Sequence, residues 1–199
     1  DSIMAYKQHF IEWFSGKQIP SYWTKDTVSG SGTGAMVDEV DGGFKLTVTS
    51  ATYQHVNYHF NNKRQYANNG SVLIATIKDY KVGSSGGTMI GFVGNTGVSP
   101  SNSAYIQSDL GATSWIVYSH DGSSQTGITL SKSLDTNWFN LKVECGSSDV
   151  KISTNAVLDT TKTTNLPSAK IMPNFSSQTG GGSAGAEAVG IRYMECYNT

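Results

Sequence analysis

The sequence predicts an all-β protein built as a two-sheet antiparallel β-sandwich, and three observations support this fold class. Apolar and polar residues alternate with a period of two in several short segments, most clearly at 44–49 and 139–145. Gly, Ser and Asn separate these segments, and the 199 residues include 22 glycines. Helix signals are nearly absent. Many short strands with one face packed in a core and the other exposed to solvent indicate a sandwich or a barrel.

The strands follow one another between turns, and we expect them at residues 35–40, 44–49, 56–60, 71–81, 88–95, 104–108, 115–119, 127–129, 138–145, 150–154 and 191–198. Tight turns are predicted at 41–43 and 121–122. Residues 4–14 form either a short helix or an extended arm that tucks Phe10, Trp13 and Phe14 into the sandwich edge. Residues 176–185 are almost wholly Ser, Gly, Gln and Thr, which predicts a flexible or partner-ordered loop.

Length and composition favour one domain over 1–199, with 1–24 as an N-terminal arm and edge strand. Charged residues make up 15% of the chain and the formal net charge is −1. A surface rich in Ser, Thr, Asn and Gly fits an extracellular or virion-surface protein. The chain has no basic stripe for nucleic acid and no apolar run long enough to span a membrane. The start at Asp1, with no Met and no apolar leader, fits removal of a leader or of a preceding domain.

The two cysteines, Cys145 and Cys196, each lie at or near the end of a predicted strand. They form a disulfide if those strands are neighbours in an oxidising compartment, or they are separate buried thiols. No Cys or His cluster has the spacing of metal ligands, because His55 and His59 are about 13 Å apart along a strand. Calcium would need a run of acids that the chain lacks. We therefore predict no metal or cofactor.

The segment 53–60 is the most informative part of the chain. Val56, Tyr58 and Phe60 share one strand face, which is suited to a core. The other face carries Tyr53, His55, Asn57 and His59, which are groups that stack on a sugar ring and hydrogen-bond its hydroxyls. An ordinary exposed polar face is the alternative. If the two histidines share a binding face, affinity should change between about pH 5 and 7.

Four segments, taken in order, resemble the concanavalin A-like lectin/glucanase jelly roll, which laminin G-like modules share. They are the aromatic-rich start at 10–24, the strand after a glycine turn at 43–48, the Trp-led alternating strand at 135–144 and the closing strand at 191–198. The resemblance implies two curved sheets, of which the concave one carries the ligand. It places the strands 56–60, 88–95, 104–108 and 115–119 on or near that surface.

The same resemblance adds outward-facing site candidates to those of the segment 53–60. They are Tyr105, Gln107 and Trp115, with Tyr118 as a weaker candidate and with Arg64 assisting if the ligand is acidic. At the rim of this surface it places Asn95, Asp109, His120 and Asp121.

Catalysis is disfavoured by the arrangement of acids. Glycoside hydrolysis usually needs two carboxylates at a defined separation, and the Glu-x-Asp-x-(x)-Glu strand of hydrolases of this fold is absent. The nearest acids, at 38–41, sit at a turn. The Tyr and His pair of polysaccharide lyases has its ingredients here but not its spacing.

We therefore predict a non-catalytic, lectin-like carbohydrate-binding module of an extracellular or virion-surface protein, with a glycan or polysaccharide as partner. One alternative is a structural or decoration module that contacts neighbouring subunits or domains of a larger assembly. A less favoured alternative is a polysaccharide lyase or glycoside hydrolase.

Overall fold

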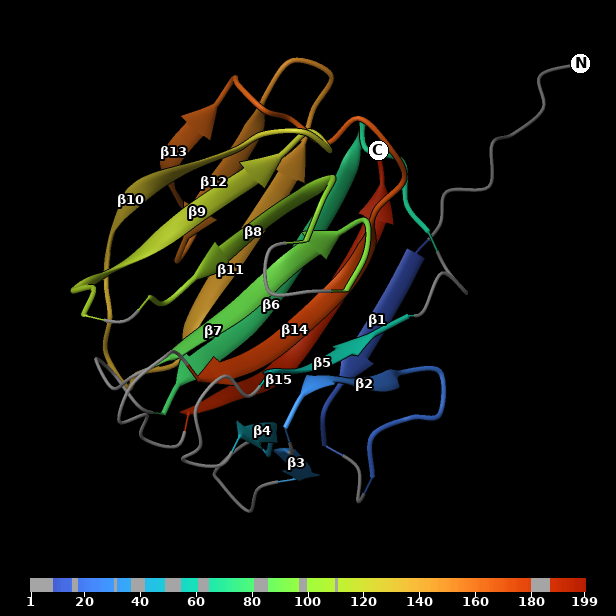
Figure 1. Cartoon of the computed structure of the whole chain (residues 1–199), viewed down its shortest axis with the longest axis vertical. Coiled ribbons are helices and arrows are strands. Elements are labelled where there is room, and N and C mark those ends of the chain that lie inside the picture. Colours follow the sequence, from blue (N-terminus) through green and yellow to red (C-terminus); the bar gives the residue numbers. More distant parts are fainter. Residues whose placement is uncertain are drawn as a thin grey trace, which may run out of the picture.

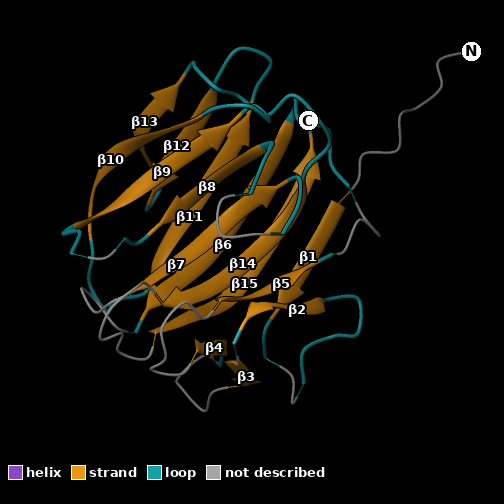
Figure 2. Ribbon diagram, viewed as in Figure 1, coloured by secondary structure: helices purple, strands orange, loops and turns teal. Residues whose placement is uncertain are grey.

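The computed structural model describes residues 9–15, 18–30, 32–36, 42–48, 55–60, 65–80, 86–96, 100–109, 111–179 and 187–199. These residues form strands and loops without a helix (Figure 2), which confirms the predicted all-β class. None of them forms a helix that is long and apolar enough to cross a bilayer. The strands are β1 (His9–Trp13), β2 (Thr24–Ser29), β3 (Gly32–Met36), β4 (Phe44–Val48), β5 (His55–His59), β6 (Ser71–Asp79), β7 (Gly86–Val93), β8 (Ser103–Gln107), β9 (Ser114–His120), β10 (Gln125–Ser133), β11 (Phe139–Cys145), β12 (Val150–Thr154), β13 (Val157–Lys162), β14 (Met172–Thr179) and β15 (Glu187–Asn198).

Two antiparallel sheets stack face to face (Figure 1). The eight-stranded sheet has the order β13-β12-β11-β6-β15-β4-β3, and β1 also pairs with β15. The seven-stranded sheet has the order β10-β9-β8-β7-β14-β5-β2. The predicted β-sandwich is confirmed, and β5, β7, β8 and β9 share one sheet as expected.

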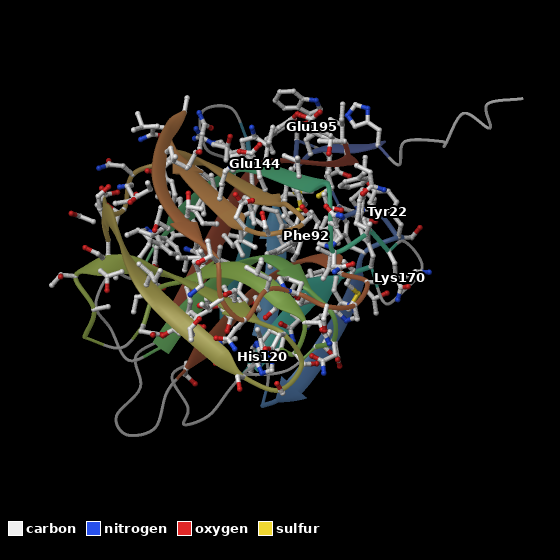
Figure 3. All side chains as sticks on the ribbon, turned by 90° about the horizontal axis from the view of Figure 1, so that it is seen from above. Tyr22, Phe92, His120, Glu144, Lys170 and Glu195 are labelled. Atoms are coloured by element: carbon white, nitrogen blue, oxygen red, sulfur yellow. The ribbon has the colours of Figure 1, made fainter. Side chains whose placement is uncertain are left out.

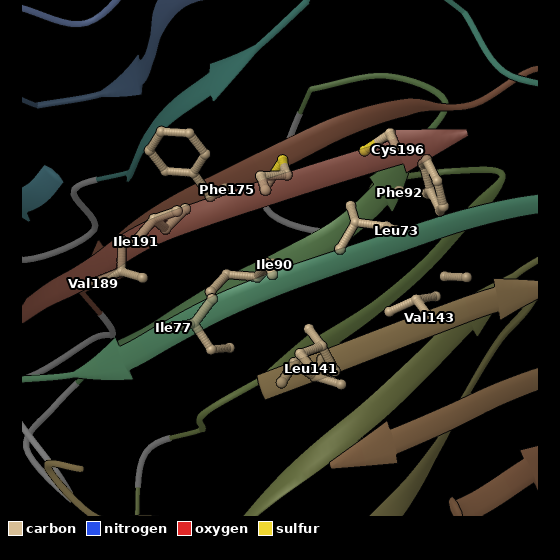
Figure 4. Close-up of a cluster of buried hydrophobic side chains, with 14 of the residues drawn as sticks. Leu73, Ile77, Ile90, Phe92, Leu141, Val143, Phe175, Val189, Ile191 and Cys196 are labelled. Carbon is tan, nitrogen blue, oxygen red and sulfur yellow. The ribbon is translucent and has the colours of Figure 1, made fainter. Parts of the chain in front are cut away.

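The core lies between the sheets, where the inward parity of each strand is apolar. The rings of Tyr58 and Phe175 stack at a centroid distance of 5.4 Å with an interplanar angle of 8°. In Figure 3, Phe92 lies between the layers, while Glu144 and Glu195 lie beyond one layer and His120 lies on the opposite side. Each sheet therefore has an inner face in the core and an outer face. Figure 4 shows core side chains from both sheets, including Leu73, Ile77, Ile90, Phe92, Leu141, Val143, Phe175, Val189, Ile191 and Cys196.

The first described segment is a strand, so the helical alternative for residues 4–14 is wrong over 9–13 and the extended arm is correct there. Phe10 and Phe14 are buried, and the Phe10 ring packs edge-on against Phe60 at 4.8 Å. The expectation that Trp13 is also tucked in is wrong, because its side chain is 66% exposed. The reason is parity: alternate residues of β1 face opposite sides of the sheet.

The prediction of a flexible loop over 176–185 is wrong for 176–179, which belong to β14; residues 180–185 lie outside the described part. β14 is an interior strand that pairs with β5 on one side and with β7 on the other. Ser and Gln have low intrinsic strand preference, but two ladders of backbone hydrogen bonds hold them in an interior strand. Tertiary pairing therefore outweighs local composition here.

The two cysteines are free and buried, so the alternative of separate thiols is correct. Cys145 lies on β11 and Cys196 on β15, and β6 runs between these strands. Burial raises the pKa of the Cys145 thiol to about 12. Cys145 therefore serves as a small apolar core residue.

Candidate functional site

The outer face of the seven-stranded sheet is built by strand parity. On β5, Val56 and Tyr58 point into the core, as predicted, so His55, Asn57 and His59 face outward. The neighbouring strand β14 inserts Phe175 into the core, which turns its alternate residues outward as well. The outward positions of the sheet carry amide, imidazole, hydroxyl and phenol groups, interrupted by glycine and methionine. They include His55, Asn57, His59, Asn174, Ser176, Gln178, Met89, Gly91, Tyr105, Gln107 and Tyr118.

Five of these residues form what we call the β5–β14 polar cluster: His55, Asn57, Asn174, Ser176 and Gln178. The register sets Asn57 opposite Ser176 and His55 opposite Gln178. Buried polar atoms without a hydrogen-bond partner are Asn57 Nδ2, Asn174 Oδ1, Ser176 Oγ and Gln178 Oε1, whereas the His55 ring interacts with the Asn57 side chain. A buried polar atom without a hydrogen bond costs about 1–3 kcal/mol. These four atoms lie together on the outer side of β5 and β14, whereas Ser177 Oγ and Trp115 Nε1, which also lack partners, lie on the core side.

The sequence correctly predicted which residues of β5 face outward, but it did not predict how little of their surface is exposed. The outward residues were expected to be exposed to solvent, yet Asn57 is only 1% exposed, and His55 and His59 are also buried. The low-propensity strand β14, which the sequence did not reveal, flanks β5 and supplies three members of the cluster. The predicted site residues Tyr53 and Arg64 lie outside the described residues.

Burial keeps the histidines of this face neutral. It lowers the pKa of His55 to about 4, while a hydrogen bond with the Asn57 side chain and the charge of the Asp26 carboxylate act in the opposite direction. Burial also lowers the pKa of His59, again opposed by Asp26. The lowered pKa places the protonation of His55 below the window between pH 5 and 7 in which the sequence predicts a change in affinity.

A pocket of about 330 Å³ adjoins the polar cluster at the β2 edge. The strand register places Thr24 beside His59 and Asp26 beside Asn57. The Thr96 hydroxyl donates a hydrogen bond of 2.9 Å to the Asp26 carboxylate, which ties the loop after β7 to β2. The pocket provides an opening next to otherwise buried groups. It is lined by Thr24, Lys25, Asp26, His59, Gly94, Thr96, Met172 and the predicted rim residue Asn95.

A tyrosine pair forms the other end of the outer face. The rings of Tyr105 and Tyr118 lie 5.6 Å apart. The Tyr118 hydroxyl donates to the Asp109 carboxylate at 2.5 Å, and Gln107 Nε2 donates to the same carboxylate. Gln125 Nε2 donates to the Tyr105 hydroxyl at 2.6 Å. Two predicted residues, Tyr105 and Gln107, thus belong to a fixed network.

Desolvation raises the pKa of both phenols, and for Tyr118 the Asp109 carboxylate raises it further. Both phenols therefore stay protonated at physiological pH.

Trp115 does not belong to this face. It is fully buried in the core, and its ring lies 5.4 Å from Phe139 of the opposite sheet. Along β9 the inward parity is taken by Trp115 and Val117, and the large indole fills the space between the layers. The prediction of Trp115 as an outward ligand contact is wrong.

Acidic groups are scarce on this sheet. Asp26 is the only Asp or Glu on the seven strands as the structure assigns them, and Asp109 lies just beyond β8. The acids at 38–41 lie outside the described residues. Within the described part of the chain, no three metal-ligating side chains gather into a group.

No protein-family model and no curated protein matches the chain. Solved structures do match over nearly its whole length. The carbohydrate recognition domain of Emp47p has a TM-score of 0.64 at 12% identity, covering 96% of this chain and 94% of that one. The GH16 protein of the Bacteroides ovatus mixed linkage glucan PUL has a TM-score of 0.67 at 15% identity, covering 93% and 98%. The β-glucanase of Bacillus licheniformis has a TM-score of 0.64 at 15% identity, covering 96% and 98%. The fold of this chain is therefore that of the concanavalin A-like lectins and glucanases, as the sequence resemblance implied.

Proposed function

We propose that this protein binds glycans without cleaving them, through the outer face of its seven-stranded sheet. The observation that carries the proposal is the β5–β14 polar cluster, whose buried polar atoms lack partners. The cluster mixes donors, such as Asn57 Nδ2, with acceptors, such as Asn174 Oδ1 and Gln178 Oε1. An anion would need donors and a cation would need acceptors. A sugar hydroxyl both donates and accepts hydrogen bonds, so a polyhydroxylated ligand can pair with the donors and with the acceptors of the cluster.

The charges of the sheet fit a neutral or weakly charged glycan. The Lys and Arg residues of the seven strands are Lys25 and Lys132, and both ammonium groups are engaged. Lys25 Nζ donates to the Gly32 carbonyl at 2.6 Å, and Lys132 pairs with Asp135 at 2.6 Å. His55 is neutral above about pH 5. Hydrogen bonds, together with the Tyr118 ring, therefore supply the recognition.

A glycan array with matched variants tests the proposal. Ser176 and Ser177 are adjacent, both are buried, and the hydroxyl of each is unpartnered, yet they face opposite sides of the sheet. We expect wild-type protein to bind a related set of glycans, Ser176→Ala to weaken binding about fivefold to tenfold, and Ser177→Ala to leave it unchanged. A blank array with folded protein, or equal losses in both variants, would contradict this site.

A hydrolase is the second candidate function, because the structural neighbours include glucanases and because Asp26 lines the pocket. The absence of a second acid from the strands of this sheet weighs against it, since the usual mechanism needs two carboxylates. Release of reducing ends from a bound polysaccharide, lost in Asp26→Asn, would establish hydrolysis. A new unsaturated uronate absorbance would instead indicate a lyase.

The cellular setting follows from the same proposal. A glycan-binding module with few charges and a surface of Ser, Thr and Asn fits a secreted or particle-surface protein. Contacts with neighbouring subunits would be an additional role, detected as co-purification of an intact assembly. Surface labelling of intact cells or particles tests this location.

A further inference from the structure

The outer face of the opposite, eight-stranded sheet carries an exposed aromatic surface at one edge. β1 pairs with β15 so that Trp13 lies opposite Tyr193, Ile11 opposite Glu195, and His9 opposite Tyr197. We call these six residues the β1–β15 surface. Trp13 is 66% exposed and Ile11 is 48% exposed. Exposed apolar side chains gathered in this way mark an interaction site on a soluble protein.

A chain of contacts holds this surface in one arrangement. The Trp13 and Tyr193 rings lie 4.5 Å apart, and the Tyr193 hydroxyl donates to Glu195 Oε2 at 2.6 Å. The other carboxylate oxygen, Oε1, lies 2.8 Å from His9 Nε2. The His9 ring packs edge-on against Tyr197 at 6.0 Å. Five of the six side chains, all but Ile11, are thus held by a neighbour, so a ligand would meet an arranged surface at little entropic cost.

The strand beneath is anchored from its inner side. Phe10 packs against Trp23 and Phe60, and the Tyr22 hydroxyl donates to the carboxylate of the buried Glu12. β1 is therefore held between the core and β15. Trp13 can change without loss of core packing, because its ring contacts Tyr193 on the outer face.

A pocket of about 320 Å³ lies beside these rings and is lined by His9, Glu195, Tyr197, Asn198 and Thr199. It combines a carboxylate, an imidazole, a carboxamide and hydroxyls. The exposed Trp13 indole is not part of the lining but is linked to Glu195 through Tyr193. A flat apolar ring beside such groups suits a sugar, which has an apolar ring face and polar edges. We propose that the β1–β15 surface is a second glycan-binding site, in which a pyranose ring stacks on Trp13 and its hydroxyls bond to Glu195 and its neighbours.

The two sites would lie on opposite faces of the sandwich, since Glu195 and His120 lie on opposite sides in Figure 3. One molecule would then hold two polysaccharide chains at once and cross-link them. This consequence goes beyond glycan binding by the first face, and the second site does not depend on the first.

Tryptophan fluorescence in a Trp138→Phe background tests the second site directly. In that background Trp13 is the exposed indole, because Trp138 is partly exposed whereas Trp23 and Trp115 are buried. The probes are soluble mixed-linkage β-glucan, laminarin, galactan and mannan. We expect at least one of them to protect Trp13 from iodide quenching, and we expect this protection to persist in Ser176→Ala. Trp13→Ala should weaken the second class of binding at least tenfold, and Trp13→Phe should restore part of it.

Three results would overturn the second site. The first is that no polysaccharide of the panel protects Trp13. The second is that Ser176→Ala abolishes the protection of Trp13, which would mean one site only. The third is a dimer in light scattering that Trp13→Ala dissociates, which would assign this surface to self-association. Loss of the first class of binding alone would instead count against the proposed function and leave the second site standing.

Discussion

The Tyr118 ring lies directly over Gly127 of the neighbouring strand. A Cβ at Gly127 would come within 2.8 Å of Tyr118 Cε1, closer than side chains tolerate. The missing side chain lets the ring settle against β10, while the Asp109 carboxylate fixes its hydroxyl. The protein thus positions both the ring and its hydroxyl.

Substitutions at this ring should separate stacking from hydrogen bonding. We expect Tyr118→Ala to weaken glycan binding about tenfold, because the apolar platform is lost. Tyr118→Phe should keep most of the affinity. Gly127→Ala should lower affinity several-fold by displacing the ring, with a thermal midpoint close to that of the wild type. Titration calorimetry measures all three, and unchanged affinity in Tyr118→Ala would remove this ring from the site.

Stability should rise when the unpartnered hydroxyls are removed. Ser176→Ala and Ser177→Ala each delete a buried hydroxyl without a hydrogen bond, so each should gain about 1 kcal/mol in free energy of unfolding. Urea denaturation measures the gain. A loss of stability in both variants would show that these hydroxyls are satisfied in the native protein.

Stability should also depend on pH through His55. Its pKa is about 4 in the folded protein and near 6.5 when unfolded. Between these values the unfolded state binds more protons, so stability is full above about pH 6.5 and falls as the pH drops towards 4. The loss is on the order of 3 kcal/mol at the acid end.

Denaturation curves from pH 4.5 to 7.5 should therefore show a flatter profile for His55→Leu than for wild-type protein. Glycan affinity of the wild type should stay constant from about pH 5.5 to 8. Equal slopes in the two proteins would indicate that His55 titrates normally.

Trp115→Ala should act through the core. Removing a fully buried indole typically costs about 3–5 kcal/mol, and Trp115 packs against Phe139 of the opposite sheet. We expect a large drop in the denaturation midpoint, with glycan affinity near normal at low temperature where the variant is folded. Selective loss of affinity at unchanged stability would return Trp115 to the binding face.

The sequence was most reliable where alternation coincided with packing. In β4 and β11 the period of two is clear, because one face of each strand packs in the core. The assignment of Val56 and Tyr58 to the core followed from the same rule. Parity alone could not show that Asn57 is buried, because burial depends on neighbouring strands distant in sequence.

The features missed were those set by tertiary pairing. β14 reads as a polar loop, yet it is an interior strand and carries Asn174, Ser176 and Gln178. Trp115 was expected on the surface and is buried, whereas Trp13 was expected in the sandwich edge and is exposed. The sequence does not determine which side of a strand faces inward when the strand is a short edge segment or carries aromatic residues on both faces. A period of two separates the residues of a strand into two faces, but which face lies in the core depends on how the two sheets pack together.

The alternation of Ser176 and Ser177 also has an evolutionary consequence. Adjacent residues of β14 face opposite sides of the sheet, so that Ser176 faces the proposed ligand and Ser177 faces the core. Mutations at every second position can therefore alter what the protein recognises while the packing beneath stays intact. A scaffold of this kind can diverge in specificity through single substitutions and retain the same three-dimensional form at very low sequence identity.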